Sequence, residues 1–368
     1  MSSIETTARP QAEAGRETVH ASVRKHKLHQ ESVMMCIVGG LAIFGHFPLL
    51  VEHISDLMLR PHYQFILFLP VGAALLVMER RRDQVLARSG TQNIELRQSD
   101  IHPAKLRYSL ALVVIALVAL AAAVWIWSAR VAMISAMLTA FSLILAFGGR
   151  GLLRIAFPAW LLLWLAMPLP FNRDYWLIAE LRDVTTRWAS RVLDQIGVLH
   201  LVNGNIIELP GQKLFVADAC SGIHSLYVLL AFALFIGLYL HRRALHVILL
   251  LLSTFGIVLV ENVMRITGVA AGLHAGFDMS SGWKHSTFGG VLFVLSLMLV
   301  FTTDQFFAFL LPDQLFRSFW NRRGIGPRLQ IAADESTKVR SVGRWLVPFG
   351  VAFALLGMVQ LVMMPANG

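Results

Sequence analysis

The sequence predicts an all-α protein, a polytopic bundle of about nine transmembrane helices with an extracytoplasmic amphipathic helix and a short extended segment. Of its 368 residues, 56% are hydrophobic and only 15% are charged, whereas about a quarter of the residues of a soluble domain are charged. Apolar runs of 17 or more residues recur, and each is long enough to cross a hydrocarbon core. These run lengths disfavour a soluble helical bundle. The net charge of +10 fits Arg-rich cytoplasmic loops better than nucleic-acid binding, so no nucleic-acid partner is expected.

The first polar segment, residues 1–32, is expected to be a cytoplasmic tail. It is not expected to be a cleavable signal peptide, because no small-residue cleavage pattern follows the first apolar run. The apolar runs expected to span the membrane lie at about 33–51, 63–78, 108–127, 131–147, 153–169, 219–240, 244–264, 286–310 and 345–364. Among the connections, GGRGLLR at 148–154 and a Gly-rich segment at 265–284 are expected to be loops. A basic linker, 311–344, precedes the last span.

Residues 171–216 interrupt the succession of spans. The segment 174–197 is predicted to be an amphipathic helix, because apolar residues recur there at three- and four-residue spacing opposite charged ones. The residues of this apolar face are Trp176, Leu177, Leu181, Val184, Trp188, Val192 and Ile196. Such a helix either lies along the membrane surface or caps the ends of the spans, and the pattern does not separate the two. Around 203–209, alternating apolar residues indicate a short strand or extended segment.

The distribution of Lys and Arg predicts how the chain crosses the membrane. If the N-terminus is cytoplasmic, every Arg-rich loop faces the cytoplasm, as the positive-inside rule requires. These loops are 79–107, 148–154, 241–243 and 312–344. The same topology places Cys220, Arg265 and His285 together on the opposite, non-cytoplasmic side. This agreement supports one composite site.

Cys220 is the first candidate for chemistry. It lies in GNIIELPGQKLFVADACSGIHSLY (204–227), and the helix of the sixth span is expected to start near Asp218. In the first turn, the positive end of the helix dipole favours a thiolate, although the carboxylate of Asp218 opposes it. A small buried helix residue is an equally weighted alternative. The second cysteine, Cys36, lies inside the first apolar run, where a buried inert thiol is expected, and the two cysteines do not suggest a disulfide framework.

Arg265 is the second candidate. On a helix, Glu261 and Arg265 share a face and Asn262 lies beside them, so we expect Glu261 to contact Arg265. A polar cluster on one face of a span points away from lipid. A guanidinium held in this way has donors left for a developing oxyanion. The alternative is an arginine that snorkels to the membrane interface.

Two histidines compete for the role of acid or base. His285 lies in WKHSTFGG at the start of the eighth span. His224 is four residues after Cys220, so it lies on the same helical face within reach of the thiol. The sequence does not rank the two, and a lone interfacial histidine is commonly only a border residue.

Three stretches occur in order with a span between each: GNIIELPGQKLFVADACSGIHSL, then NVMRI, then WKHSTFG. Together they resemble the exosortase/archaeosortase family of polytopic membrane cysteine enzymes. Its pattern is an acidic residue two before Cys-Ser-Gly, then Asn-x-x-Arg at the end of the next span, then a His or Arg leading the one after. The pattern matches here at Asp218, Cys220, Ser221, Asn262, Arg265 and His285. The resemblance covers about 60–310, and HYQFILFLP at 62–70 resembles a degraded form of the family's early Tyr-Ser-His-Gly segment. His224 stands where the family often has Arg.

The resemblance implies a cysteine protease/transpeptidase in the bacterial inner membrane, with a catalytic domain over 33–310 and an additional C-terminal span within 345–368. The implied substrates are membrane-anchored proteins that carry a short motif such as Pro-Glu-Pro, a transmembrane helix and a basic tail. Cys220 would attack the peptide carbonyl at the periplasmic face, Arg265 would stabilise the oxyanion and His285 would protonate the leaving amine. The resemblance also implies an association with exopolysaccharide secretion. No metal or organic cofactor is expected.

Two alternatives come from other classes of protein. In a non-enzymatic transporter or assembly subunit of exopolysaccharide export, Glu261, Arg265 and His285 would line a permeation path, with no need for a thiol. The sequence does not show the inverted repeats found in many transporters, which disfavours this alternative. The other alternative is a thiol acyltransferase that uses lipid donors.

Overall fold

The computed structural model describes residues 33–34, 36–89, 103–216, 222–311 and 342–363. Three of the candidate residues, Asp218, Cys220 and Ser221, lie outside the described residues, as do the predicted tail and most of the predicted basic linker. The described residues are almost entirely helical, with one small sheet, so the prediction of an all-α polytopic membrane protein is confirmed in outline. The sheet is the exception to the all-α prediction.

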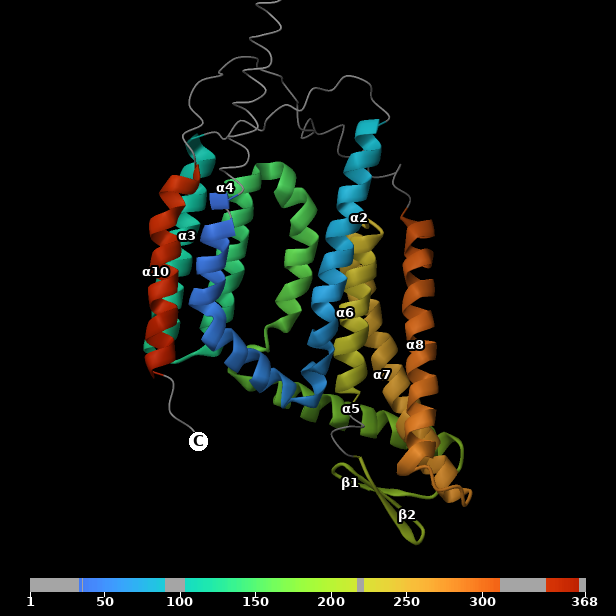
Figure 1. Ribbon diagram of the computed structural model, residues 1–368. Helices are drawn as coiled ribbons and strands as arrows, with labels where there is room; N and C mark the ends of the chain where they lie inside the picture. Colours follow the sequence, from blue (N-terminus) through green and yellow to red (C-terminus); the bar gives the residue numbers. More distant parts are fainter. Residues whose placement is uncertain (1–32, 35, 90–102, 217–221, 312–341, 364–368) are drawn as a thin grey trace, which may run out of the picture. The chain divides into compact units, whose positions relative to one another are not determined.

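Figure 1 labels the main helices and strands in chain order. The first helix is Cys36–Met58, and those that follow are η1 (Pro61–Phe68), α2 (Leu69–Ser89), α3 (Pro103–Trp125), α4 (Ala129–Leu163), η2 (Trp164–Ala166), η3 (Pro170–Asn172), α5 (Arg173–Gln195), α6 (Ile223–Tyr239), α7 (Ala244–His274), α8 (Gly282–Leu310) and α10 (Val342–Met363). Among the described residues, 6 helices are long and apolar enough to span a membrane, or 7 if the bent pair Gly151–Ala166 and Pro170–Gln195 is counted as one. The other two predicted spans correspond to shorter apolar helices, Ile223–Tyr239 and Val351–Gln360.

Two predicted loops are helical in the structure. α7 continues to His274, so the prediction that a loop begins at Arg265 is wrong. The extra turns persist because Ile266, Val269 and Ala270 form a buried face that packs against the sheet, which outweighs the low helix propensity of the glycines. The predicted loop 148–154 is also wrong, because helical structure is continuous through Ala129–Leu163.

The structure divides into two compact units, each described here by itself. The first unit comprises residues 1–55, 91–157 and 334–368. In it α10 packs against α3, and Gln360 ties α10 to the first helix: its amide nitrogen donates to the carbonyl of Gly45 at 3.0 Å, and its amide oxygen accepts from the N–H of Leu49 at 3.3 Å. These bonds satisfy a side chain that has no exposed surface.

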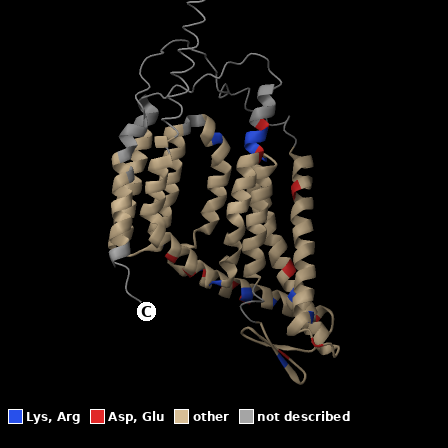
Figure 2. Ribbon diagram, in the orientation of Figure 1, with Lys and Arg blue, Asp and Glu red and all other residues tan. Residues whose placement is uncertain are grey.

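The second unit, residues 56–90 and 158–333, contains the candidate site. α7 packs against both α6 and α8, and α5 runs crosswise at their lower ends (Figure 1). Charged residues gather along α5 and near the helix ends of this unit, with long uncharged stretches between them (Figure 2). This distribution is the one expected for helices whose middle turns face hydrocarbon.

The predicted helix 174–197 is confirmed as α5, and of its predicted apolar face Leu181 is buried within the protein. The buried side chains include Asp174, Thr185 and Thr186, whereas Trp176 and Trp188 are more than half exposed. The aromatic residues instead lie on the outer surface of the helix, where tryptophans of membrane proteins commonly meet the interface.

The extended segment is larger than predicted. It forms a three-stranded antiparallel sheet in the order β1 (Leu201–Asn203), β2 (Ile206–Leu209), β3 (Gln212–Phe215). The register pairs Ile207 with Leu214, and both side chains are buried against the last turns of α7. The sheet is therefore fixed to the part of α7 that carries Arg265.

Candidate active site

Three helices bring the candidate residues to one end of the second unit. α6 starts immediately after Gly222, the first described residue after Cys220. Arg265 lies inside α7, and His285 lies in the first turn of α8. Because α7 packs between α6 and α8, these segments adjoin at the end of the unit that also carries the sheet (Figure 1).

Arg265 and His285 are in contact. Nη2 of Arg265 lies 3.3 Å from Nε2 of His285, and Nδ1 of His285 lies 3.0 Å from the carbonyl oxygen of Met279. A carbonyl only accepts, so Nδ1 carries the proton that is donated to Met279. An arginine only donates, so Nε2 accepts from Arg265. The geometry therefore defines a neutral imidazole whose Nε2 lone pair points at the guanidinium.

The connection between α7 and α8 orients this histidine. Asp278 accepts hydrogen bonds from the N–H of Ser280 at 3.0 Å and from its hydroxyl at 2.7 Å. These two bonds from Ser280 lower the pKa of the exposed Asp278 carboxyl. The turn that they close presents the carbonyl of Met279 to His285.

Gly289, one turn beyond His285, leaves space for the guanidinium. A Cβ at this position would lie 2.8 Å from Nη2 and 2.9 Å from Cζ of Arg265. Only a residue without a side chain permits this approach, so the guanidinium lies against the backbone of α8. The second glycine of the pair, Gly290, would meet nothing within 4 Å.

The expected contact between Glu261 and Arg265 is not formed. Within the described part of the chain, Glu261 instead accepts from the hydroxyl of Ser225 on α6 at 3.4 Å, and no ion pair within 4.0 Å joins it to Arg265. Glu261 is 4% exposed, and its Oε2 has no described hydrogen-bond partner. One turn apart on α7, the two side chains take different partners, because Arg265 extends to α8 while Glu261 meets α6.

Asn262 connects three elements around the start of α6. Its Nδ2 donates to Oγ1 of Thr185 on α5 at 3.0 Å, and Thr185 in turn donates to the carbonyl of Leu181 at 2.7 Å. Gly222 adopts the left-handed conformation (φ 76°), and a Cβ there would lie 3.0 Å from Cγ of Asn262. The glycine of Cys-Ser-Gly therefore meets both a conformational and a steric requirement. Asn262 is 1% exposed, and its Oδ1 faces no described partner.

His224 occupies the first turn of α6 and is exposed. It interacts electrostatically with both Arg265 and His62, so it belongs to the same polar region. The structure thus brings both competing histidines to Arg265, one in direct contact and the other at longer range. Because Cys220 lies outside the described residues, the choice between them stays open.

A second polar network near the site was not predicted. Oδ2 of Asp174 lies 3.1 Å from Nη1 of Arg60 and 3.2 Å from Nε2 of His62. The ring of His62 stacks on that of Tyr227, one turn beyond His224 on α6, at 5.7 Å between centroids. The one available signal was the acidic residue at the start of a predicted helix; a contact across 112 residues has no signature in a single sequence.

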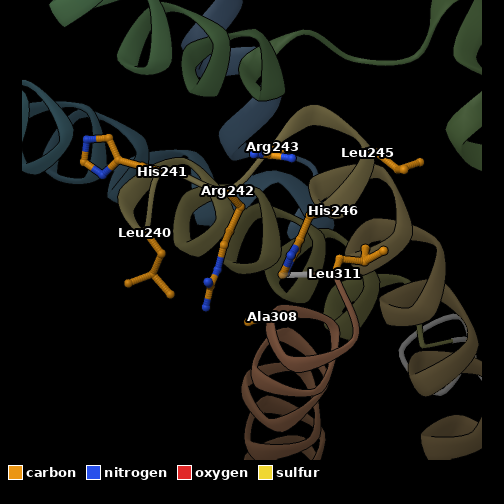
Figure 3. Close-up of a pocket in the computed structure, with 8 residues that line it drawn as sticks. All are labelled: Leu240, His241, Arg242, Arg243, Leu245, His246, Ala308 and Leu311. Carbon is orange, nitrogen blue, oxygen red and sulfur yellow. The ribbon is translucent and has the colours of Figure 1, made fainter. Parts of the chain in front are cut away.

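The opposite end of the second unit holds a cavity of about 140 Å³ (Figure 3). Arg242 donates twice to Asp304, at 3.0 and 2.6 Å, and His246 lies 2.8 Å from the same carboxylate. Arg265 is 19 residues beyond His246 on α7, which is about 30 Å along the helix axis. The cavity is thus remote from Arg265, and two of its lining residues, Arg242 and His246, bind the buried carboxylate of Asp304.

Cys36 differs from its prediction. It is a free and exposed cysteine at the start of the first helix rather than a buried one. Its helix is described from Cys36 onward, so the side chain lies in the first turn of the described helix. It belongs to the first unit and not to the candidate site.

Residues 58–302 match the family model described as "Transmembrane exosortase (Exosortase_EpsH)". The matched segment contains every candidate residue of the site and the whole sheet. The search of curated proteins and the search of solved structures found no match.

Proposed function

The chain belongs to the transmembrane exosortase family, and we propose that it is a membrane cysteine protease/transpeptidase that cleaves C-terminal sorting signals of exported proteins. The observation that carries the proposal is the 3.3 Å contact between Arg265 and His285, which joins two of the three sequence motifs across α7 and α8. The third motif, Cys-Ser-Gly, ends at Gly222, which packs on Asn262 three residues before Arg265. The proposed setting is the bacterial plasma membrane, with the site on the outer face.

The proposed mechanism begins with the thiol of Cys220. Nε2 of His285 is the acceptor that takes the thiol proton, and the thiolate attacks the peptide carbonyl. The guanidinium of Arg265 then donates to the oxyanion rather than to His285. As the tetrahedral intermediate collapses, His285 returns the proton to the leaving amine. The acyl group passes from the sulfur to an acceptor nucleophile or to water.

The neutral state of His285 supports its role as the proton acceptor. The bond from Nδ1 to Met279 fixes the tautomer that leaves Nε2 free of a proton. His224 is the alternative base if it lies nearer the sulfur than His285 does.

The test is the processing of a tagged reporter that carries a Pro-Glu-Pro motif, one transmembrane helix and a basic tail. Cys220→Ser should nearly abolish the size shift of the reporter while leaving the enzyme in the membrane. An alcohol has a pKa far above the value of about 8.5 of a thiol, so little nucleophile remains. Cys36→Ser should process the reporter normally, because Cys36 belongs to the other unit.

Arg265→Lys should also be severe, with a loss of roughly 100- to 1000-fold in rate, because lysine keeps the charge but not the planar fork of donors. Normal processing by Cys220→Ser would remove the enzyme proposal. The transporter or assembly alternative, which needs no thiol, would then stand.

A further inference from the structure

β3 has one free edge, and the register identifies which of its backbone groups lie on it. The N–H of Val216 donates to the carbonyl of Asn205 at 2.9 Å, so this residue directs its backbone groups toward β2. Inward and outward groups alternate along an antiparallel strand. Leu214 therefore also points inward, and the N–H and C=O groups of Lys213 and Phe215 point outward. The side chains of these two residues are 71% and 59% exposed.

These outward groups have no hydrogen-bond partner in the described chain. Two donors and two acceptors alternate along the edge, with about 7 Å between equivalent groups. The N–H and C=O groups of a second extended backbone recur at the same interval, so one such strand can bond to all four groups. The chemistry of the edge thus specifies an extended peptide.

The edge also leads to the candidate active site. Leu214 and Val216 pack in the same buried cluster as Ile266, the neighbour of Arg265. Cys220 follows Val216 by four residues, which reach at most about 14 Å. The end of β3 at Val216 is therefore within chain reach of the proposed nucleophile, about 14 Å at most.

We propose that the substrate polypeptide binds as a fourth strand on the free edge of β3, with its residues that precede the scissile bond paired to Lys213 and Phe215. This proposal rests on the proposed function and names how that site holds its substrate. The substrate strand runs parallel to β3. In the sequence, β3 precedes Cys220. The paired substrate residues likewise precede the scissile bond, so both strands run from N- to C-terminus toward the nucleophile.

A second copy of the chain fits the edge less well than a substrate does. Each Lys213 pairs with Glu208 at 2.8 Å, and two β3 strands joined edge to edge in antiparallel fashion would place two such exposed lysines on one seam. Exposed lysines on edge strands oppose such self-association. A substrate peptide need not present a lysine to Lys213, so this opposition does not keep it from the edge.

The first experiment removes one outward N–H. Lys213→Pro deletes the donor without breaking the β2–β3 ladder, and Lys213→Ala measures the contribution of the side chain alone. We expect Lys213→Pro to raise KM for the tagged Pro-Glu-Pro reporter roughly 3- to 10-fold beyond Lys213→Ala. The matched control is Val202→Pro on β1. The β1–β2 register makes Val202 the outward residue of the opposite edge, and KM should not change.

The second experiment does not depend on proline. In full-length Cys220→Ala, a photoreactive benzoylphenylalanine in place of Phe215 should crosslink to the unprocessed reporter, and the same group in place of Val202 should not. Equal KM values for Lys213→Pro and Lys213→Ala, or equal crosslinking at both positions, would overturn the proposal. Crosslinking of Phe215 to a second copy of the chain would also overturn it. Processing by the wild type but not by Cys220→Ser tests the enzyme function separately from the edge.

Discussion

Arg265 depends on a neighbour that has no side chain. Its guanidinium lies against the backbone of α8 at Gly289, where a Cβ would come within 3.0 Å of two guanidinium atoms. The arginine is thus held between His285 on one side and the helix backbone on the other. A small change in α8 therefore reaches the proposed oxyanion donor directly.

Gly289→Ala should lower the processing rate roughly 10- to 100-fold, because the new methyl group displaces the guanidinium by about an ångström from its place beside His285. Gly290→Ala is the matched control. It adds the same methyl group one residue later, where nothing lies within 4 Å, and should leave the rate unchanged. The measurement is the initial rate of reporter processing at equal enzyme levels in the membrane. Equal rates for the two variants would contradict this account of Arg265.

At the scale of elements, α5 connects the sheet to the start of α6. Thr185 on α5 accepts from Asn262 on α7, and Asn262 packs on Gly222. The side chains of both Thr185 and Asn262 are buried, so their bond is not replaced by water if one partner is lost. The crosswise helix thereby fixes the position at which the Cys-Ser-Gly motif ends.

Thr185→Val should destabilise the protein by about 1–3 kcal/mol, because valine has nearly the same shape but leaves Nδ2 of Asn262 buried without an acceptor. Thr185→Ser restores the hydroxyl and should recover most of the loss. Thermal unfolding in detergent, followed by the loss of helical circular dichroism, measures the effect. A midpoint for Thr185→Val equal to that of the wild type would show that Thr185 does not hold Asn262.

The sequence predicted the structure best where its apolar runs are long. The runs at 108–127 and 286–310 correspond closely to α3 and α8, because about twenty apolar residues have few other stable arrangements in a membrane. The prediction of a loop from Arg265 onward failed because it rested on the glycines of this segment and did not include the sheet that packs against it. The sheet that stabilises those turns is itself assembled from three strands only 3 to 4 residues long.

The candidate site was predictable in part. The three motifs located Arg265 and His285 on neighbouring segments of the chain, and the structure brings them into contact. The partner of Glu261 was not predictable. A spacing of four residues on one helix favoured Arg265, whereas the tertiary contact with Ser225 determined the outcome. The network of Arg60, His62 and Asp174 was beyond any local pattern for the same reason.

For the whole molecule, the predicted topology remains to be tested. A topology reporter fused after Gly211 should report a position outside the cytoplasm. The same reporter fused after Gly324 should report a cytoplasmic position. The physical reason is the excess of Lys and Arg in 79–107 and 312–344. The same reporting side for both fusions would contradict the topology and the proposed outer-face site.

The bond between Gln360 and Gly45 has a consequence for the history of the family. The helix that begins at Cys36 and the helix α10 lie almost wholly outside the matched segment 58–302, one before it and one after it. Gln360 of α10 finds both partners of its side-chain amide on the first helix, so α10 without that helix would leave a buried amide unpaired in hydrocarbon. We therefore expect family members that carry α10 with a glutamine at this position to carry the first helix as well.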